Sequence, residues 1–165
     1  AEELLGMRIQ LVFLGHGEEK YEHFLRQLAD KYPDRVSANI IFDDALARKI
    51  YAASDIFLMP SLYEPCGISQ LIAMSYGSVP IVRETGGLKD TVKPFDEFSE
   101  EGNGFSFTNY NALEMLSAVK KAVNLYRNRR IWSRLVKNAV ETDYSWEKPA
   151  REYSELYRRM LAGSF

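Results

Sequence analysis

The sequence predicts an α/β fold in which helices cover both faces of a parallel sheet. Two observations support this prediction. Short apolar runs of β-rich composition alternate with segments whose apolar residues recur every three or four positions, and such alternation is typical of parallel strands connected by helices. The length of 165 residues and the hydrophobic content of 46% also suit a single domain, residues 1–165, with one core.

Strands and helices are expected to follow one another through the first two thirds of the chain. Strands are predicted at residues 7–14, 36–42, 56–59, 79–82 and 104–107, and helices at about 18–31, 45–54 and 67–76. This order describes a doubly wound, Rossmann-like sheet, which begins with a strand near its centre. Because residues 1–6 resemble the tail of a helix, we expect that first strand to be missing from this sequence.

The last third of the sequence predicts three helices. One apolar stripe begins after Asn111, which we expect to act as its N-cap. A second stripe runs from Ile131 to Ala139, and Ser145 is expected to cap a final helix with an apolar side. The acidic segment 96–101 is expected to be a solvated loop.

Composition excludes several classes of function. The formal net charge of −2, without a block of Lys and Arg, predicts no nucleic-acid partner. One cysteine, Cys66, forms no internal disulfide, and no apolar run of about 18 residues predicts a membrane span. We therefore expect a cytoplasmic protein, with a plastid as the alternative. Neither zinc spacing nor a dinucleotide or Walker motif is present, so no metal and no cofactor are expected.

The segment from Ser61 to Gln70 is the strongest candidate for chemistry. It joins a predicted strand to a helix, and ligands of open α/β sheets bind at the carboxyl ends of the strands. Gly67 allows close approach of the backbone, and the N–H groups that open the next helix can hold a diphosphate. Glu64 would add a carboxylate to the same cleft. The alternative is an ordinary Pro-Gly turn with a surface glutamate, and spacing alone does not decide between them.

Three stretches of this region together resemble the donor-domain signature of starch and bacterial glycogen synthases. They are residues 64–71 (EPCGISQL), 73–82 (AMSYGSVPIV) and 85–92 (TGGLKDTV). The resemblance extends over essentially the whole chain, and it implies the C-terminal, nucleotide-sugar-binding half of a two-domain GT-B enzyme. Such an enzyme transfers glucose from ADP-glucose, with retention and without a metal, to the non-reducing end of an α-1,4-glucan.

The resemblance also implies roles for individual residues. Glu64 would be the catalytic glutamate beside the donor glucose. Phe42, at the end of its strand, would place an aromatic ring against the adenine, and the alternative is an ordinary core phenylalanine. The remaining donor-binding candidates are the amides of Cys66, Gly67 and Ile68, the hydroxyl of Ser69, and the second glycine turn formed by Thr85, Gly86 and Gly87. As an alternative, that turn connects a strand to a helix and has no further role.

Two departures shape the expected function. Related sugar transferases often carry a second glutamate where this sequence has Ile72, which favours the synthase branch. The basic pair of the family and its acceptor-side domain, which would hold the α-1,4-glucan, are expected upstream of Ala1. The isolated chain is therefore expected to be inactive, with ADP-glucose or ADP as its ligand. Two alternatives are a sibling enzyme that uses UDP-glucose and a nucleotide-sugar-binding module without catalysis.

Overall fold

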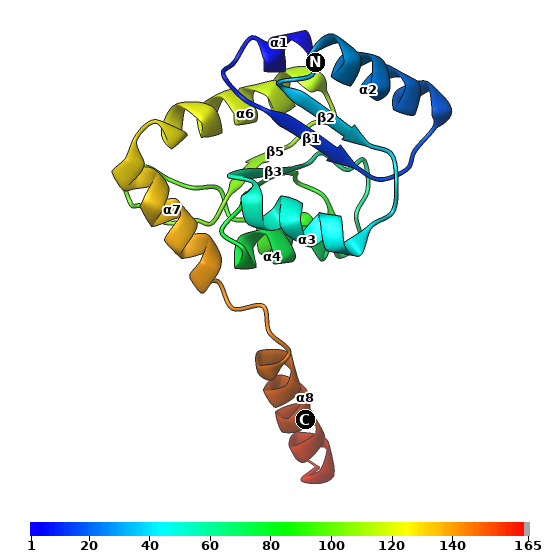
Figure 1. Cartoon of the computed structure of the whole chain (residues 1–165). Coiled ribbons are helices and arrows are strands. Elements are labelled where there is room, and N and C mark those ends of the chain that lie inside the picture. Colours follow the sequence, from blue (N-terminus) through cyan, green and yellow to red (C-terminus); the bar gives the residue numbers. More distant parts are fainter. Residues whose placement is uncertain (164–165) are drawn as a thin grey trace.

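The chain forms two parallel sheets flanked by helices (Figure 1). The computed structural model describes residues 1–163, without the side chain of Lys148. Strand β1 (Leu11–Leu14) pairs with β2 (Val36–Asn39). The second sheet has the order β3 (Ile56–Met59), β4 (Val79–Arg83) and β5 (Phe105–Phe107). Every neighbouring pair is parallel, so the predicted α/β class is confirmed.

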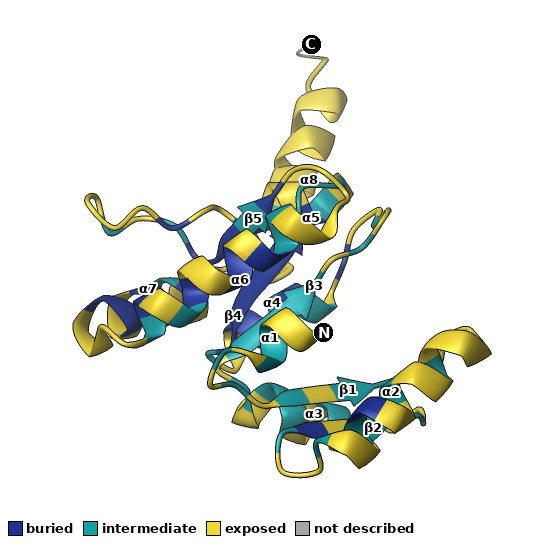
Figure 2. Ribbon diagram, turned by 90° about the horizontal axis from the view of Figure 1, so that it is seen from above, coloured by how far each residue is buried: buried dark blue, intermediate teal, exposed yellow. Residues whose placement is uncertain are grey.

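The division into two sheets differs from the single sheet that alternation alone suggests. Among the described residues, β1 pairs only with β2, and β3 pairs only with β4. The usual doubly wound order is 3-2-1-4-5-6. Without strand 1, this order leaves a pair, 3-2, and a group of three, 4-5-6, which correspond to the two sheets seen here. Figure 2 shows β1 and β2, with α2 and α3, set apart from the other three strands. Helix α3 connects the groups, because Tyr51 stacks on Tyr76 with a centroid distance of 6.4 Å.

Helices cover both faces of the larger sheet. Helices α6 and α7 pack on one face of β4, and α4 and α5 also contact this strand. The helices of the described chain are α1 (Glu2–Leu5), α2 (Glu19–Lys31), α3 (Asp44–Ala53), α4 (Ser69–Ser75), α5 (Gly86–Thr91), α6 (Ala112–Tyr126), α7 (Arg129–Glu141) and α8 (Glu147–Leu161). Within this part of the chain, no helix is both long and apolar enough to span a membrane.

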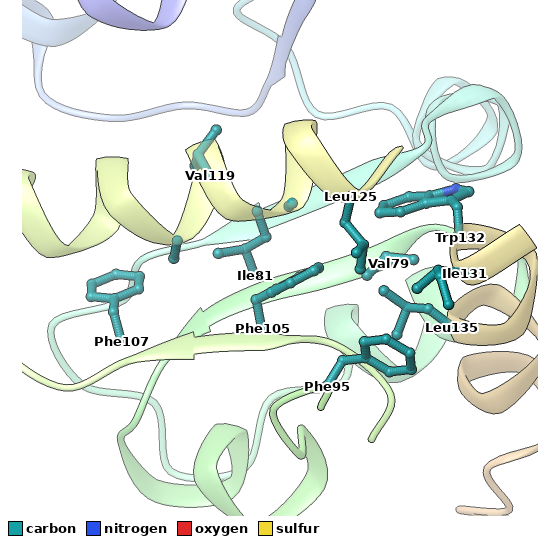
Figure 3. Packing of buried hydrophobic residues seen from close by; sticks show 12 residues of the cluster. Val79, Ile81, Phe95, Phe105, Phe107, Val119, Leu125, Ile131, Trp132 and Leu135 are labelled. Carbon is teal, nitrogen blue, oxygen red and sulfur yellow. The ribbon is translucent and has the colours of Figure 1, made fainter. Parts of the chain in front are cut away.

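The main core lies between β4, β5 and the helices α6 and α7 (Figure 3). Side chains alternate between the two faces of a strand. Val79 and Ile81 therefore join this core, whereas Val82 packs on the other side against Leu88 of α5. All four side chains are fully buried. This packed sheet gives a rigid base to the loops that leave its strands.

The predicted N-caps of α6 and α8 have opposite outcomes. The side chain of Asn111 accepts a hydrogen bond of 2.9 Å from the backbone N–H of Glu114, which confirms the N-cap of α6. The prediction for Ser145 is wrong, because Trp146 occupies the N-cap position of α8 and makes no side-chain capping bond. Helix α8 extends away from the rest of the chain, and none of its described side chains is buried (Figure 1). Its predicted apolar side is therefore exposed.

Candidate functional site

The predicted site residues lie mainly on two loops that leave neighbouring parallel strands. The loop between β3 and α4 (residues 60–68, hereafter the β3–α4 loop) contains Glu64, and the turn after β4 leads into α5. Because β3 and β4 are parallel neighbours, their carboxyl ends meet at one edge of the sheet. The structure thus brings together Glu64, Cys66, Gly67, Ile68, Ser69, Thr85, Gly86 and Gly87.

The two glycines of the second turn touch the backbone of the β3–α4 loop. A Cβ atom at Gly86 would lie 1.9 Å from the carbonyl oxygen of Glu64, and one at Gly87 would lie 2.1 Å from that of Cys66. The N–H of Gly87 also donates a hydrogen bond of 3.2 Å to the carbonyl of Pro65. No other residue type leaves room for this contact. The glycines open α5 instead of forming a separate turn, and they support the loop that contains Glu64.

Gln70 holds the end of the same loop, although the sequence analysis did not single it out. Its side chain is fully buried, and its Nε2 donates hydrogen bonds to the carbonyl of Gly67 at 2.9 Å and to Oγ1 of Thr91 at 3.1 Å. Oγ1 of Thr91 in turn donates to the carbonyl of Gly87 at 2.7 Å. The sequence signal was a polar residue inside an apolar helix, but its partners become visible only in the fold.

The end of the β3–α4 loop carries backbone donors without acceptors in the described part of the chain, where Gly67 is buried and Cys66 and Ile68 are exposed. Helix α4 begins at Ser69 and not at Gly67 as predicted, because Gly67 has a φ of +73° and Ile68 takes the N-cap position. Among the described residues, the N–H groups of Cys66, Gly67, Ile68 and Ser69 have no hydrogen-bond acceptor. The hydroxyl of Ser69 likewise makes no hydrogen bond in this part of the chain. Such groups can receive an anion.

Glu64 is half-buried, and its carboxylate has no partner in the part of the chain that the structure describes. None of the described residues donates a hydrogen bond to it or forms an ion pair with it. The neighbouring thiol of Cys66 is free and exposed. His16 lies between two glycines after β1, and its Nδ1 lies 3.4 Å from Oε1 of Glu22 on α2. The loop therefore offers one carboxylate and four neighbouring backbone donors to a ligand. His16 makes its contact with Glu22 and not with the thiol of Cys66.

Arg83 was also missed by the sequence analysis. It ends β4, and its Nε donates a hydrogen bond of 2.8 Å to the carbonyl of Ser61, while Nη2 donates to that of Leu62. The signal in the sequence was a charged residue at the carboxyl end of an otherwise apolar strand. The carbonyl groups that it would meet are set by the course of the adjacent loop, which no local pattern describes.

Phe42 is not part of a strand. The prediction that β2 extends to residue 42 is wrong, because β2 ends at Asn39, where its partner β1 ends at Leu14. Phe42 is 85% exposed just before the N-cap of α3, which excludes the alternative of a core phenylalanine. Phe42 follows the smaller sheet, whereas Glu64 follows the larger one.

Comparison with known proteins identifies related sequences. The family model described as "Glycosyl transferases group 1" matches residues 2–139. The glycogen synthase of Clostridium novyi is 59% identical over 160 residues, which are 97% of this chain and 33% of that protein. The glycogen synthase of Desulforamulus reducens is 53% identical over 160 residues, with the same two coverages of 97% and 33%. The chain thus spans about a third of the length of these relatives.

A solved structure has the same fold over most of the chain. It is the catalytic domain of starch synthase IV from Arabidopsis thaliana, bound to ADP and acarbose. The TM-score is 0.81 and the sequence identity 38%, and the match covers 93% of this chain and 32% of that one. The Rossmann-like architecture, the C-terminal half of a GT-B fold, is therefore shared with a protein that binds ADP.

Proposed function

Because the chain belongs to the glycosyl transferases group 1 family, we propose that it is the donor-binding part of a glucosyltransferase. In a protein of the relatives' length, it would transfer glucose from ADP-glucose to the non-reducing end of an α-1,4-glucan, as in glycogen or starch synthesis. The names of the bacterial relatives and the ADP bound to the plant neighbour support this proposal. The expected location is the cytoplasm.

The proposal rests on one observation. The β3–α4 loop carries both backbone N–H groups and a carboxylate that have no partner among the described residues. Among the described residues, the N–H groups of residues 66–69 have no hydrogen-bond acceptor. The Glu64 carboxylate has no hydrogen-bond donor among the same residues. When the sugar bond breaks, negative charge grows on the leaving diphosphate and positive charge on the sugar. Fixed N–H groups stabilise the first charge, and a fixed carboxylate stabilises the second.

The remaining candidates would complete the donor site. We assign the exposed ring of Phe42 to the adenine base, and Gly86 and Gly87 to support of the β3–α4 loop. Thr85 would border the diphosphate from the second turn. The glucan acceptor would bind to the part of the protein that the relatives possess beyond this third of their length.

Replacing Glu64 with glutamine tests the catalytic assignment in a protein of the relatives' length. Glu64→Gln should lower kcat on the order of 100-fold or more, because a neutral amide stabilises the developing positive charge poorly. The affinity for ADP should change little, since backbone donors hold the diphosphate. Transfer of radiolabelled glucose from ADP-glucose to glycogen gives kcat, and calorimetry gives the ADP affinity.

The control for this experiment is Glu97→Gln, which alters an exposed carboxylate on the surface loop after Phe95. It should leave both quantities unchanged. A kcat near normal for Glu64→Gln would show that this carboxylate has no role in the transition state. If the unsubstituted protein prefers UDP-glucose, the nucleotide assignment fails and the sibling transferase replaces it. Binding of ADP without transfer from either donor would support the binding module.

A further inference from the structure

Arg83 attaches the end of β4 to the start of the β3–α4 loop. Its Nε donates to the carbonyl of Ser61 at 2.8 Å, and Nη2 donates to the carbonyl of Leu62. Nη1 lies 3.5 Å from the carbonyl of Thr108 after β5, and the guanidinium lies 5.8 Å from the ring centre of Tyr110. One side chain therefore spans the ends of three neighbouring strands.

The guanidinium of Arg83 is held by carbonyl groups and not by an acid. Among the described residues, no carboxylate lies within 4.0 Å of it. Arginine presents its N–H donors in a rigid planar fork, so it can fix several acceptors in one geometry. Here two of these acceptors are successive peptide groups, and Glu64 follows them by two residues. Arg83 thus restrains the backbone just before the carboxylate.

The β3–α4 loop is held in two separate parts. Arg83 holds residues 61 and 62. Gly86, Gly87 and Gln70 hold residues 64–67 through the contacts described above. Loss of Arg83 would therefore release the segment that leads into Glu64, while the backbone donors of residues 66–69 keep their support.

We infer that Arg83 is a positioning residue that sets the place of the Glu64 carboxylate through the carbonyl groups of Ser61 and Leu62. The inference rests on the proposed function, because it assigns Glu64 to glucosyl transfer. A misplacement of about 1 Å costs on the order of 100-fold in rate. Arg83 acts on turnover and not on nucleotide binding, since no part of the diphosphate-binding backbone depends on it.

The substitutions Arg83→Met and Arg83→Lys test this inference in a protein of the relatives' length. Met keeps the apolar stem of the side chain and removes every donor, and Lys keeps the charge without the fork. Arg83→Met should lower kcat by about 10- to 100-fold and change the Kd for ADP by less than about twofold. Arg83→Lys should retain an intermediate kcat, because one ammonium group can still donate to a carbonyl of the loop.

Arg129→Met is the matched control. The guanidinium of Arg129 lies over the ring of Tyr126 at 5.1 Å, is exposed, and makes no hydrogen bond or ion pair among the described residues. This variant should keep both kcat and ADP affinity. NMR order parameters of the backbone of residues 61–64 should be lower in Arg83→Met than in Arg129→Met, and equal values would overturn the restraint itself, whatever the activity.

Kinetic outcomes separate this inference from the proposed function. If the unsubstituted protein transfers glucose but Arg83→Met keeps a kcat within about twofold of normal, the positioning role is wrong and the proposed function stands. If kcat and ADP affinity fall together, Arg83 supports the whole fold of the site, and the inference is overturned. If the unsubstituted protein transfers no glucose from ADP-glucose or UDP-glucose, the proposed function fails and the role of Arg83 in it fails too.

Discussion

Among single residues, Gly86 shows how closely two backbones can constrain a sequence. Its φ is +45°, and a Cβ atom would lie 1.9 Å from the carbonyl oxygen of Glu64. Gly86→Ala should therefore destabilise the protein by about 2 kcal/mol or more, since both a left-handed backbone and a clash with main-chain atoms are costly. Chemical denaturation of the isolated chain measures this loss.

Gly17→Ala is the control for that substitution, because a Cβ atom there would meet no heavy atom within 4 Å. Its effect should stay within about 0.5 kcal/mol. Equal stabilities of the Gly86 and Gly17 variants would mean that the start of α5 and the β3–α4 loop can move apart without loss of unfolding free energy.

Phe42 gives a second prediction for a single residue. Its exposed ring leaves a face free for a base, and stacking of a base on an aromatic ring contributes about 1 to 3 kcal/mol. Phe42→Ala should weaken ADP binding about 5- to 150-fold in a protein of the relatives' length. Phe98→Ala, which removes a ring that is 99% exposed on the acidic loop, should have no effect. Unchanged ADP affinity in Phe42→Ala would remove Phe42 from the donor site.

The motif around Glu64 could be recognised from the sequence, but the groups that support it could not. Glu64, Pro65 and Gly67 stand together in the chain, so local spacing and resemblance identify them. Arg83 and Gln70 act through carbonyl groups whose positions depend on tertiary packing. Neither residue has a local pattern that predicts its partner.

Among the elements, the start of α6 has a cap that depends on pH. The Glu114 carboxylate accepts hydrogen bonds from the side chain and the N–H of Asn109 and from the N–H of Thr108. The side-chain hydrogen bond from Asn109, with these backbone donors, holds the pKa of Glu114 below its ordinary value. The contribution to stability is complete above the unfolded pKa of about 4.3, and it is lost as the pH falls through the lower folded pKa.

Glu114→Gln should therefore flatten the fall in unfolding free energy below about pH 4.3. Denaturation at a series of pH values measures the slope. Glu152→Gln is the control, since Glu152 is exposed on α8 and makes no hydrogen bond or ion pair among the described residues. An acid slope that is the same in both variants would contradict the assignment.

Element boundaries show what periodicity can predict. Residues 56–59 form β3 as expected, because a compact apolar run is bounded by polar or turn residues on both sides. Residues 40–42 are apolar but leave the sheet, whose register between β1 and β2 ends at Leu14 and Asn39. Helix α5 begins with two glycines, which have a low intrinsic helix propensity. At this position, the close backbone contact with the β3–α4 loop requires glycine, and this requirement outweighs the low helix propensity.

At the scale of the whole molecule, the isolated chain should bind ADP weakly and transfer no glucose. Transfer needs donor and acceptor held together in a water-poor cleft, and such positioning accounts for roughly 7 to 11 kcal/mol of the barrier. Residues 66–69 offer a diphosphate backbone N–H groups and one hydroxyl but no charged side chain, and each charge-assisted hydrogen bond that such a site lacks costs about 1.5 to 3 kcal/mol. A Kd for ADP near the millimolar range is therefore expected.

Calorimetry with ADP and a transfer assay onto glycogen, both with this chain alone, test that expectation. A protein of the relatives' length serves as the positive control in both measurements. Glucan elongation by the 165 residues alone would show that one domain suffices for the reaction.

The contact of Gly86 and Gly87 with residues 64–66 also bears on motion. Because no side chain separates the two backbones, neither segment can rotate its peptide groups without displacing the other. Residues 64–66 and the start of α5 should therefore fluctuate as one rigid body, on the slower time scale of collective motions and not on the nanosecond scale of free loops. A nucleotide sugar would then meet a preformed surface, and little conformational entropy would be lost when it binds.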